Sequence, residues 1–138
     1  MIWWINVRRF CCLDSLQKLQ DAWHTKVASL LPTLLQTDDK VYVTDYIVLE
    51  TVNHLLRKTS FDAAKETLEM FIRSPRITTI HNDENAFRQT YDFFAKYPGL
   101  SVTDANIVLH MLRLKERNLF SFDNGFDIVK EISRRLSS

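Results

Sequence analysis

Short runs of β-branched and aromatic residues alternate along this chain with longer amphipathic stretches, and this alternation restricts the fold more than any other feature. The runs cover residues 2–7, 41–44, 77–81 and 119–122, and each is too short for a helix. Strands separated by helices need crossover connections, which give a parallel sheet covered on both faces. We therefore expect an α/β fold, with one three-layer α/β/α domain over residues 1–138 and a mostly parallel sheet of about four strands.

Between these runs, apolar residues recur at spacings of three and four, which is typical of helices that bury one face. The pattern predicts helices over residues 10–35 in two segments, 46–58, 61–73, 83–96, 101–115 and 126–136. Asp45, Ser60 and Asn82 stand where N-caps are expected. Only 2 glycines and 3 prolines occur, too few for the many turns of an all-β sandwich or barrel.

The composition is that of an ordinary globular protein, with 46% hydrophobic and 25% charged residues. The net charge of +1 does not by itself demand a nucleic-acid or membrane partner. No apolar run approaches the roughly 18 residues of a membrane-spanning helix. The adjacent Cys11 and Cys12 provide no disulfide framework, which favours a reducing compartment. We expect a cytoplasmic protein with no membrane partner.

Acidic residues follow the predicted strands, at the edge where parallel sheets gather their functional sites. Asp45 comes directly after the second strand, and Glu50 lies about one helical turn further on. Asp123 follows the fourth strand, and Asp104 stands at the start of a helix. Carboxylates that converge at one edge form a pocket of hard oxygen ligands, which suits Mg²⁺ or Mn²⁺.

Most of these acids also have a simpler structural explanation. Asp45 is a suitable N-cap, Asp104 is the far half of a capping box opened by Ser101, and Asp123 is an ordinary turn residue. Glu50 is harder to explain in this way, because it lies among apolar residues where a solvated carboxylate is unexpected. The residues alone leave both interpretations open.

Three segments that contain these acids resemble the PIN domain family, and most closely its VapC-type toxins of bacterial toxin–antitoxin pairs. They read VTDYIVLE at residues 43–50, LSVTDA at 100–105 and LFSFD at 119–123. Their order and spacing, and the Pro-Gly turn before residue 100, agree with that family. Each segment is short, but the three in order are moderately specific, and the likeness covers nearly the whole chain.

The resemblance implies a metal-dependent endoribonuclease that hydrolyses RNA phosphodiester bonds with Mg²⁺ or Mn²⁺. By position, Glu50, Asp104 and Asp123 correspond to catalytic, metal-binding acids, with Thr103 and Asn124 in support. The resemblance also implies a toxin held in check by a small antitoxin protein. It further suggests a homodimer, for which apolar positions around residues 30–35 and 61–71 could supply the contact.

The first acidic motif departs from the family pattern. The family's first strand ends in an aspartate, whereas this chain has Asn6, a weak neutral ligand, followed by Arg8 and Arg9. An alternative register puts Arg9 at that position, so the first acid is missing in either case. We therefore expect impaired activity, and the alternative function is a non-catalytic PIN-like module that binds RNA or a protein. Arg8, Arg9, Arg57 and Lys58 are candidates for contacts with RNA phosphates.

Overall fold

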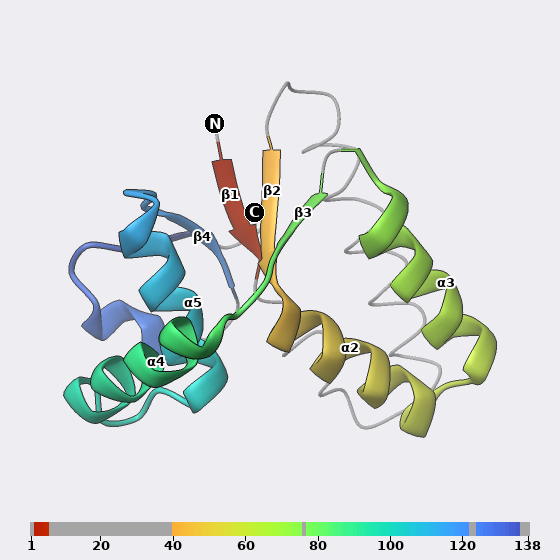
Figure 1. The fold of residues 1–138 in the computed structure, drawn as a ribbon, viewed down its shortest axis with the longest axis horizontal. Coiled ribbons are helices and arrows are strands. Elements are labelled where there is room, and N and C mark those ends of the chain that lie inside the picture. Colours follow the sequence, from red (N-terminus) through yellow and green to blue (C-terminus); the bar gives the residue numbers. More distant parts are fainter. Residues whose placement is uncertain (1, 6–39, 76, 122–123, 136–138) are drawn as a thin grey trace.

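The computed structural model describes residues 2–5, 40–75, 77–121 and 124–135, and it shows an α/β fold (Figure 1). The strands are β1 (Ile2–Ile5), β2 (Lys40–Thr44), β3 (Ile77–Ile80), β4 (Asn118–Phe120) and β5 (Ser133–Arg135). The helices are α2 (Asp45–Lys58), α3 (Phe61–Arg73), α4 (Glu84–Lys96) and α5 (Val102–Arg113), with a 3-10 helix η2 (Asn124–Ile128). The helical stretch expected over residues 10–35, including both cysteines, lies outside the described residues. The predicted alternation of strands and helices is confirmed from β2 to β4.

The five strands form one sheet in the order β3-β2-β1-β4-β5, and every described pairing is parallel. The sequence indicated about four strands, and β5 adds a fifth at the edge beside β4. The chain therefore moves outward from β1 to β2 and β3, and then returns to the other side of β1 for β4. Because all strands run the same way, their carboxyl ends lie at one edge, where sheets of this kind place their sites.

The helices flank the sheet in two pairs, with α2 and α3 on one side of the central strands and α4 and α5 on the other (Figure 1). Within each pair the helices pack closely, whereas α2 and α5 have little direct packing against each other. The core between the layers contains almost completely buried side chains from both sides, among them Val41, Val43, Ile47, Ile107 and Met111. The sheet and its core thus connect two otherwise separate helix pairs.

Two helix caps differ from the prediction by one residue. Thr44, not Asp45, caps α2, and its hydroxyl accepts a hydrogen bond from the backbone N–H three residues on. Asp83, not Asn82, caps α4 in the same way. Ser60 caps α3 as expected. Since neighbouring residues do the capping, the side chains of Asp45 and Asn82 make other contacts.

The helix predicted over residues 126–136 is wrong. The structure has η2 there, followed by β5, whose backbone pairs with the edge of β4. Phe126, Val129 and Ile132 are buried, which explains the apparent helical pattern. Their spacing of three is also the period of a 3-10 turn, and the sheet edge offers the next segment backbone hydrogen bonds in place of a helix.

The apolar stripe of α3 is wider than the face that it buries. The helical spacing of Ala64, Leu68, Phe71 and Ile72 predicts that all four face inward. Ala64 and Phe71 pack into the core, whereas Leu68 and Ile72 are exposed, Ile72 to 72%. None of the described helices is long and apolar enough to span a bilayer.

Candidate active site

Two of the three acids predicted from the sequence lie on helices that a hydrogen bond joins. Asp104 is in the first turn of α5 and is only 3% exposed, and its backbone N–H donates to the Ser101 hydroxyl at 3.0 Å. Glu50 lies in α2, and the Thr103 hydroxyl donates to its Oε1 atom at 3.3 Å. Thr103 directly precedes Asp104, so this bond brings the start of α5 to the side chain of Glu50.

Glu50 is exposed, which corrects the expectation that its apolar neighbours enclose it. Ile47, Thr51 and Leu55 form the buried face of α2. Glu50 falls at the rim of that face, because successive helix residues are turned by about 100°. A carboxylate at such a rim remains accessible to solvent and to a ligand while its helix stays packed.

The other residues proposed from the sequence fall into two groups. The residues outside the described part of the chain are Asn6, Arg8, Arg9 and Asp123. Asn124 begins η2. Arg57 and Lys58 are exposed in the last turn of α2, at the end opposite Asp45 and the strand edge.

The acids that the structure describes have donor chemistry that fits a hard divalent cation. Glu50 and Asp104 offer carboxylate oxygens, the ligands that Mg²⁺ and Mn²⁺ prefer. Within the described ranges, no group of three or more histidine, cysteine, aspartate or glutamate side chains is close enough to hold a metal ion. Any complete site would therefore need ligands from outside those ranges, and Asp123 and Asn6 are the candidates from the sequence.

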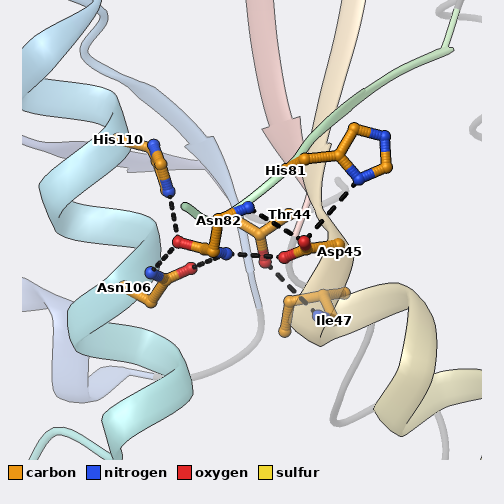
Figure 2. A network of polar contacts seen from close by, with 7 residues as sticks. All are labelled: Thr44, Asp45, Ile47, His81, Asn82, Asn106 and His110. Carbon is orange, nitrogen blue, oxygen red and sulfur yellow. Dashed lines mark hydrogen bonds and ion pairs between the residues drawn. The ribbon is translucent and has the colours of Figure 1, made fainter. Parts of the chain in front are cut away.

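A network of polar side chains lies where β2 and β3 end, between the start of α2 and the middle of α5 (Figure 2). The Asp45 carboxylate accepts from the backbone N–H of Asn82 at 2.9 Å and from its amide Nδ2 at 2.5 Å. Asn82 and Asn106 exchange two amide hydrogen bonds, of 3.1 Å and 2.6 Å. The Nε2 atom of His110 lies 2.8 Å from Asn82 Oδ1. The network therefore runs from the start of α2, through the turn before α4, to α5.

The donors and acceptors of this network follow from the charge of Asp45. An ionised carboxylate only accepts hydrogen bonds, so the amide nitrogen of Asn82 faces it and the amide oxygen faces His110. Nε2 of His110 is then the donor to that oxygen. Asn106 is fully buried, and its Nδ2 also donates to the Thr90 hydroxyl at 2.9 Å. Both amides therefore have partners for their oxygen and their nitrogen, as buried polar groups require.

His110 is held toward its neutral form. Burial lowers its pKa, and the nearby positive charge of Arg113 lowers it further. The carboxylates of Asp45 and Asp83 act in the opposite direction but do not cancel these effects. A neutral imidazole with its proton on Nε2 is sufficient for the bond to Asn82.

The sequence indicated the residues of this network only in part. Asn82 was interpreted as a helix cap and Asp45 as another, and both side chains instead contact each other. Asn106 was not singled out, although an amide in the apolar run of α5, four residues before His110, was the available signal. The sequence shows no metal-ligand spacing at His110, and in the structure its imidazole bonds to Asn82 as a structural residue of the network.

The chain belongs to the PIN domain family, whose model matches residues 18–132. This match confirms the resemblance seen in the sequence motifs. No curated protein sequence matches the chain.

Solved structures with the same fold include one VapC toxin and two VapBC structures. VapC20 of Mycobacterium tuberculosis, described as a sarcin-ricin loop cleaving toxin, has 18% identity and a TM-score of 0.72, over 93% of this chain and 94% of that one. VapBC2 of Rickettsia felis, bound to a promoter DNA fragment, has 11% identity and a TM-score of 0.64, over 99% of this chain and 98% of that one. VapBC-1 of nontypeable Haemophilus influenzae has 12% identity and a TM-score of 0.63, over 98% of this chain and 97% of that one. At these identities the likeness establishes a shared fold.

Proposed function

We propose that the protein is a metal-dependent endoribonuclease of the toxin type, with Glu50, Asp104 and Asp123 as its catalytic acids. The observation that carries the proposal is the hydrogen bond from Thr103 to Glu50, which joins two motif-bearing helices within a PIN fold. β4 ends at Phe120 and runs parallel to β1, so the chain leaves it toward the edge where β2 leads into α2. Asp123 follows three residues later in the sequence.

The proposed mechanism assigns a task to each residue. Glu50, Asp104 and Asp123 would hold the cation, and the Thr103 hydroxyl would orient Glu50. When bound, Mg²⁺ or Mn²⁺ lowers the pKa of a water molecule and stabilises charge on the phosphodiester. Asn6 would contribute one neutral oxygen where the family has a carboxylate, which weakens cation binding because a negative charge is missing.

Basic residues are candidates for holding the RNA backbone. Arg8 and Arg9 follow the first strand in the sequence, while Arg57 and Lys58 are exposed at the far end of α2. Contacts of this kind attract phosphates without reading the base sequence. Arg8 and Arg9 would also place positive charge near the cation site, which opposes cation binding further.

An antitoxin protein is the proposed partner, as the resemblance to VapC-type toxins implies. The surface formed by α2 and α3 exposes large apolar side chains, including Leu49 at 58%, Phe61 at 67% and Ile72 at 72%. A cavity of about 680 Å³ opens between these helices and β3. Exposed apolar area of this kind marks protein interaction sites. Phe61 is also a candidate for the proposed homodimer contact, whereas Phe71 is buried in the core and contributes nothing to it.

The test is cleavage of a fluorogenic RNA with Mg²⁺ or Mn²⁺, beside metal titration by calorimetry. We expect weak, metal-dependent cleavage by the chain as written, with Mn²⁺ bound better than Mg²⁺. Asn6→Asp should tighten metal binding and raise cleavage, because it restores a negative ligand. Asp104→Asn should abolish cleavage, whereas Asp92→Asn, an exposed acid on α4, should leave it unchanged.

Two outcomes would count against this proposal. Cleavage that persists in Asp104→Asn, or in the presence of a chelator, would exclude the metal-dependent mechanism. RNA binding without cleavage, even in Asn6→Asp, would favour the second candidate function, a non-catalytic RNA-binding module. The observation that favours that candidate is the missing first aspartate, with Asn6 and Arg9 as the two residues that can stand in its place.

A further inference from the structure

The two acids that the structure describes stand on helices that have little direct contact. α2 packs on α3 and α5 packs on α4, but α2 and α5 have almost no packing surface in common. Glu50 and Asp104 therefore belong to different helix pairs, on opposite sides of the central strands (Figure 1). Besides the sheet core on which both helices pack, polar contacts set the spacing between them, and the hydrogen bond from Thr103 to Glu50 is one such contact.

The polar network spans this separation (Figure 2). One end is Asp45, the first residue of α2 and five residues before Glu50. The other end is Asn106 in α5, two residues after Asp104. Asn82 is the only residue drawn between them that bonds to both, through its amide nitrogen.

We propose that Asn82 is a positioning residue, which holds α2 and α5 at the spacing that lets Glu50 and Asp104 act on the same cation. This inference rests on the proposed ribonuclease function. The amide suits the task, because it donates to a carboxylate on one side while it donates to and accepts from an amide on the other. An aspartate at position 82 would repel Asp45, and an apolar residue would remove the amide's bonds to Asp45, Asn106 and His110.

The backbone supports the same role. The N–H of Asn82 donates to Asp45 at 2.9 Å, so the side-chain and main-chain bonds to one carboxylate fix the residue's orientation. His110 adds a third contact from α5, to the amide oxygen. An error of about 1 Å in the placement of catalytic groups can cost about 100-fold in rate. Loss of the Asn82 bonds would therefore lower the rate by displacing Glu50 relative to Asp104.

The test measures the spacing of the helices directly, without metal or RNA. Spin labels are attached to cysteines placed at Leu56 of α2 and Arg113 of α5, both exposed, with Cys11 and Cys12 replaced by serine. Asn82→Ala should broaden the distance distribution obtained by pulsed EPR. The matched control is Thr67→Ala. Thr67 is a buried threonine of α3 whose hydroxyl bonds only to its own helix in the described structure, so this variant should leave the distribution narrow.

A charge exchange separates positioning from general stability. Asn82→Asp alone places two carboxylates in contact and should broaden the distribution. Combining it with Asp45→Asn restores a donor and acceptor between positions 45 and 82, and should narrow the distribution again. In the cleavage assay, Asn82→Ala should lower kcat by about 100-fold, and Thr67→Ala should not.

The outcomes decide separately on the positioning role and on the ribonuclease function. An unchanged distance distribution in folded Asn82→Ala overturns the positioning role, as does a widened spacing that leaves kcat unaltered. If Asn82→Ala does not fold, Asp45→Ala gives the decision, because it removes the network's connection to α2, together with the ion pair to the exposed His81, and keeps the amide pair. If the unaltered chain never cleaves RNA, the proposed function fails, while the distances still show whether Asn82 sets the spacing.

Discussion

At Asn106, an amide occupies a position that helix periodicity assigns to the core. Its neighbours Ala105 and Ile107 are completely buried, and so is Asn106 itself. A buried amide is tolerated only when its hydrogen bonds are made, and here Asn82 and Thr90 make them. The polar residue therefore does not weaken the core, because it connects α5 to α4 and to the turn before α4.

Replacing Asn106 tests how much its hydrogen bonds contribute to the free energy of unfolding. We expect Asn106→Ala to lower the free energy of unfolding by about 1–3 kcal/mol, because the polar groups of Asn82 and Thr90 lose their partner. Asn53→Ala, at an exposed position of α2, should change it by about 0.5 kcal/mol or less. Urea unfolding followed by circular dichroism measures both. Equal effects of the two substitutions would show that the Asn106 bonds contribute nothing net.

The residues of this region differ in how far their roles could be predicted from the sequence. Glu50 and Asp104 are predicted as site residues because each stands in a recognisable motif at a strand edge or helix start. Asn82 was assigned a different task, because Asn82 and Asp83 are both good cap residues and local propensity does not choose between them. The choice depends on Asp45, which is distant in sequence and reaches Asn82 only in the fold.

At the scale of elements, the start of α5 is the part of the fold most closely tied to the site. Ser101 caps the helix by accepting from the backbone N–H of Asp104, so the cap and the candidate acid share one helical turn. Ser60 makes the equivalent bond at the start of α3, away from the acids. The two serines are thus a natural pair for separating helix stability from site geometry.

We expect Ser101→Ala and Ser60→Ala each to reduce stability by about 1 kcal/mol, the usual effect of losing an N-cap. Only Ser101→Ala should also lower RNA cleavage beyond the loss of folded protein, because it loosens the turn that carries Thr103 and Asp104. Thermal unfolding and the cleavage assay, run on the same preparations, make the comparison. A similar loss of cleavage in Ser60→Ala would mean that stability alone explains the effect.

Element prediction succeeded where propensity and tertiary contacts agree. The strands and helices from β2 to β4 match because their apolar patterns, caps and turns all indicate the same structure. The prediction for the segment after Asn124 was wrong because the spacing of Phe126, Val129 and Ile132 is compatible with a helix. In the structure the backbone that follows pairs with the edge strand β4 instead. Sequence patterns carry no information about an available edge.

At the scale of the whole molecule, the parallel sheet joins two helix pairs, and the Asn82 network bridges them alongside the hydrogen bond from Thr103 to Glu50. The carboxyl edge of the sheet therefore leads into the helices that carry Glu50 and Asp104, and it also holds the Asn82 network that we propose aligns them. The sequence predicted the edge, because it is a property of any parallel sheet. It did not predict the bridge, because that depends on side chains meeting across elements far apart in the chain.

The bridge should make the stability of the molecule depend on pH through His110. Burial and Arg113 lower its pKa below the value of about 6.5 in the unfolded chain. Above that value His110 is neutral in both the folded and the unfolded chain, and its protonation does not reduce the free energy of unfolding. As the pH falls through about 6.5, the unfolded chain binds a proton that the folded chain does not, so the free energy of unfolding decreases until the pH is below the folded pKa.

Urea titrations at several pH values should show this decrease, and His110→Gln, which keeps a donor toward Asn82 but cannot titrate, should make it smaller. An identical pH dependence in both proteins would show that His110 does not contribute, because Asp45, Asp83 and the other histidines are common to both.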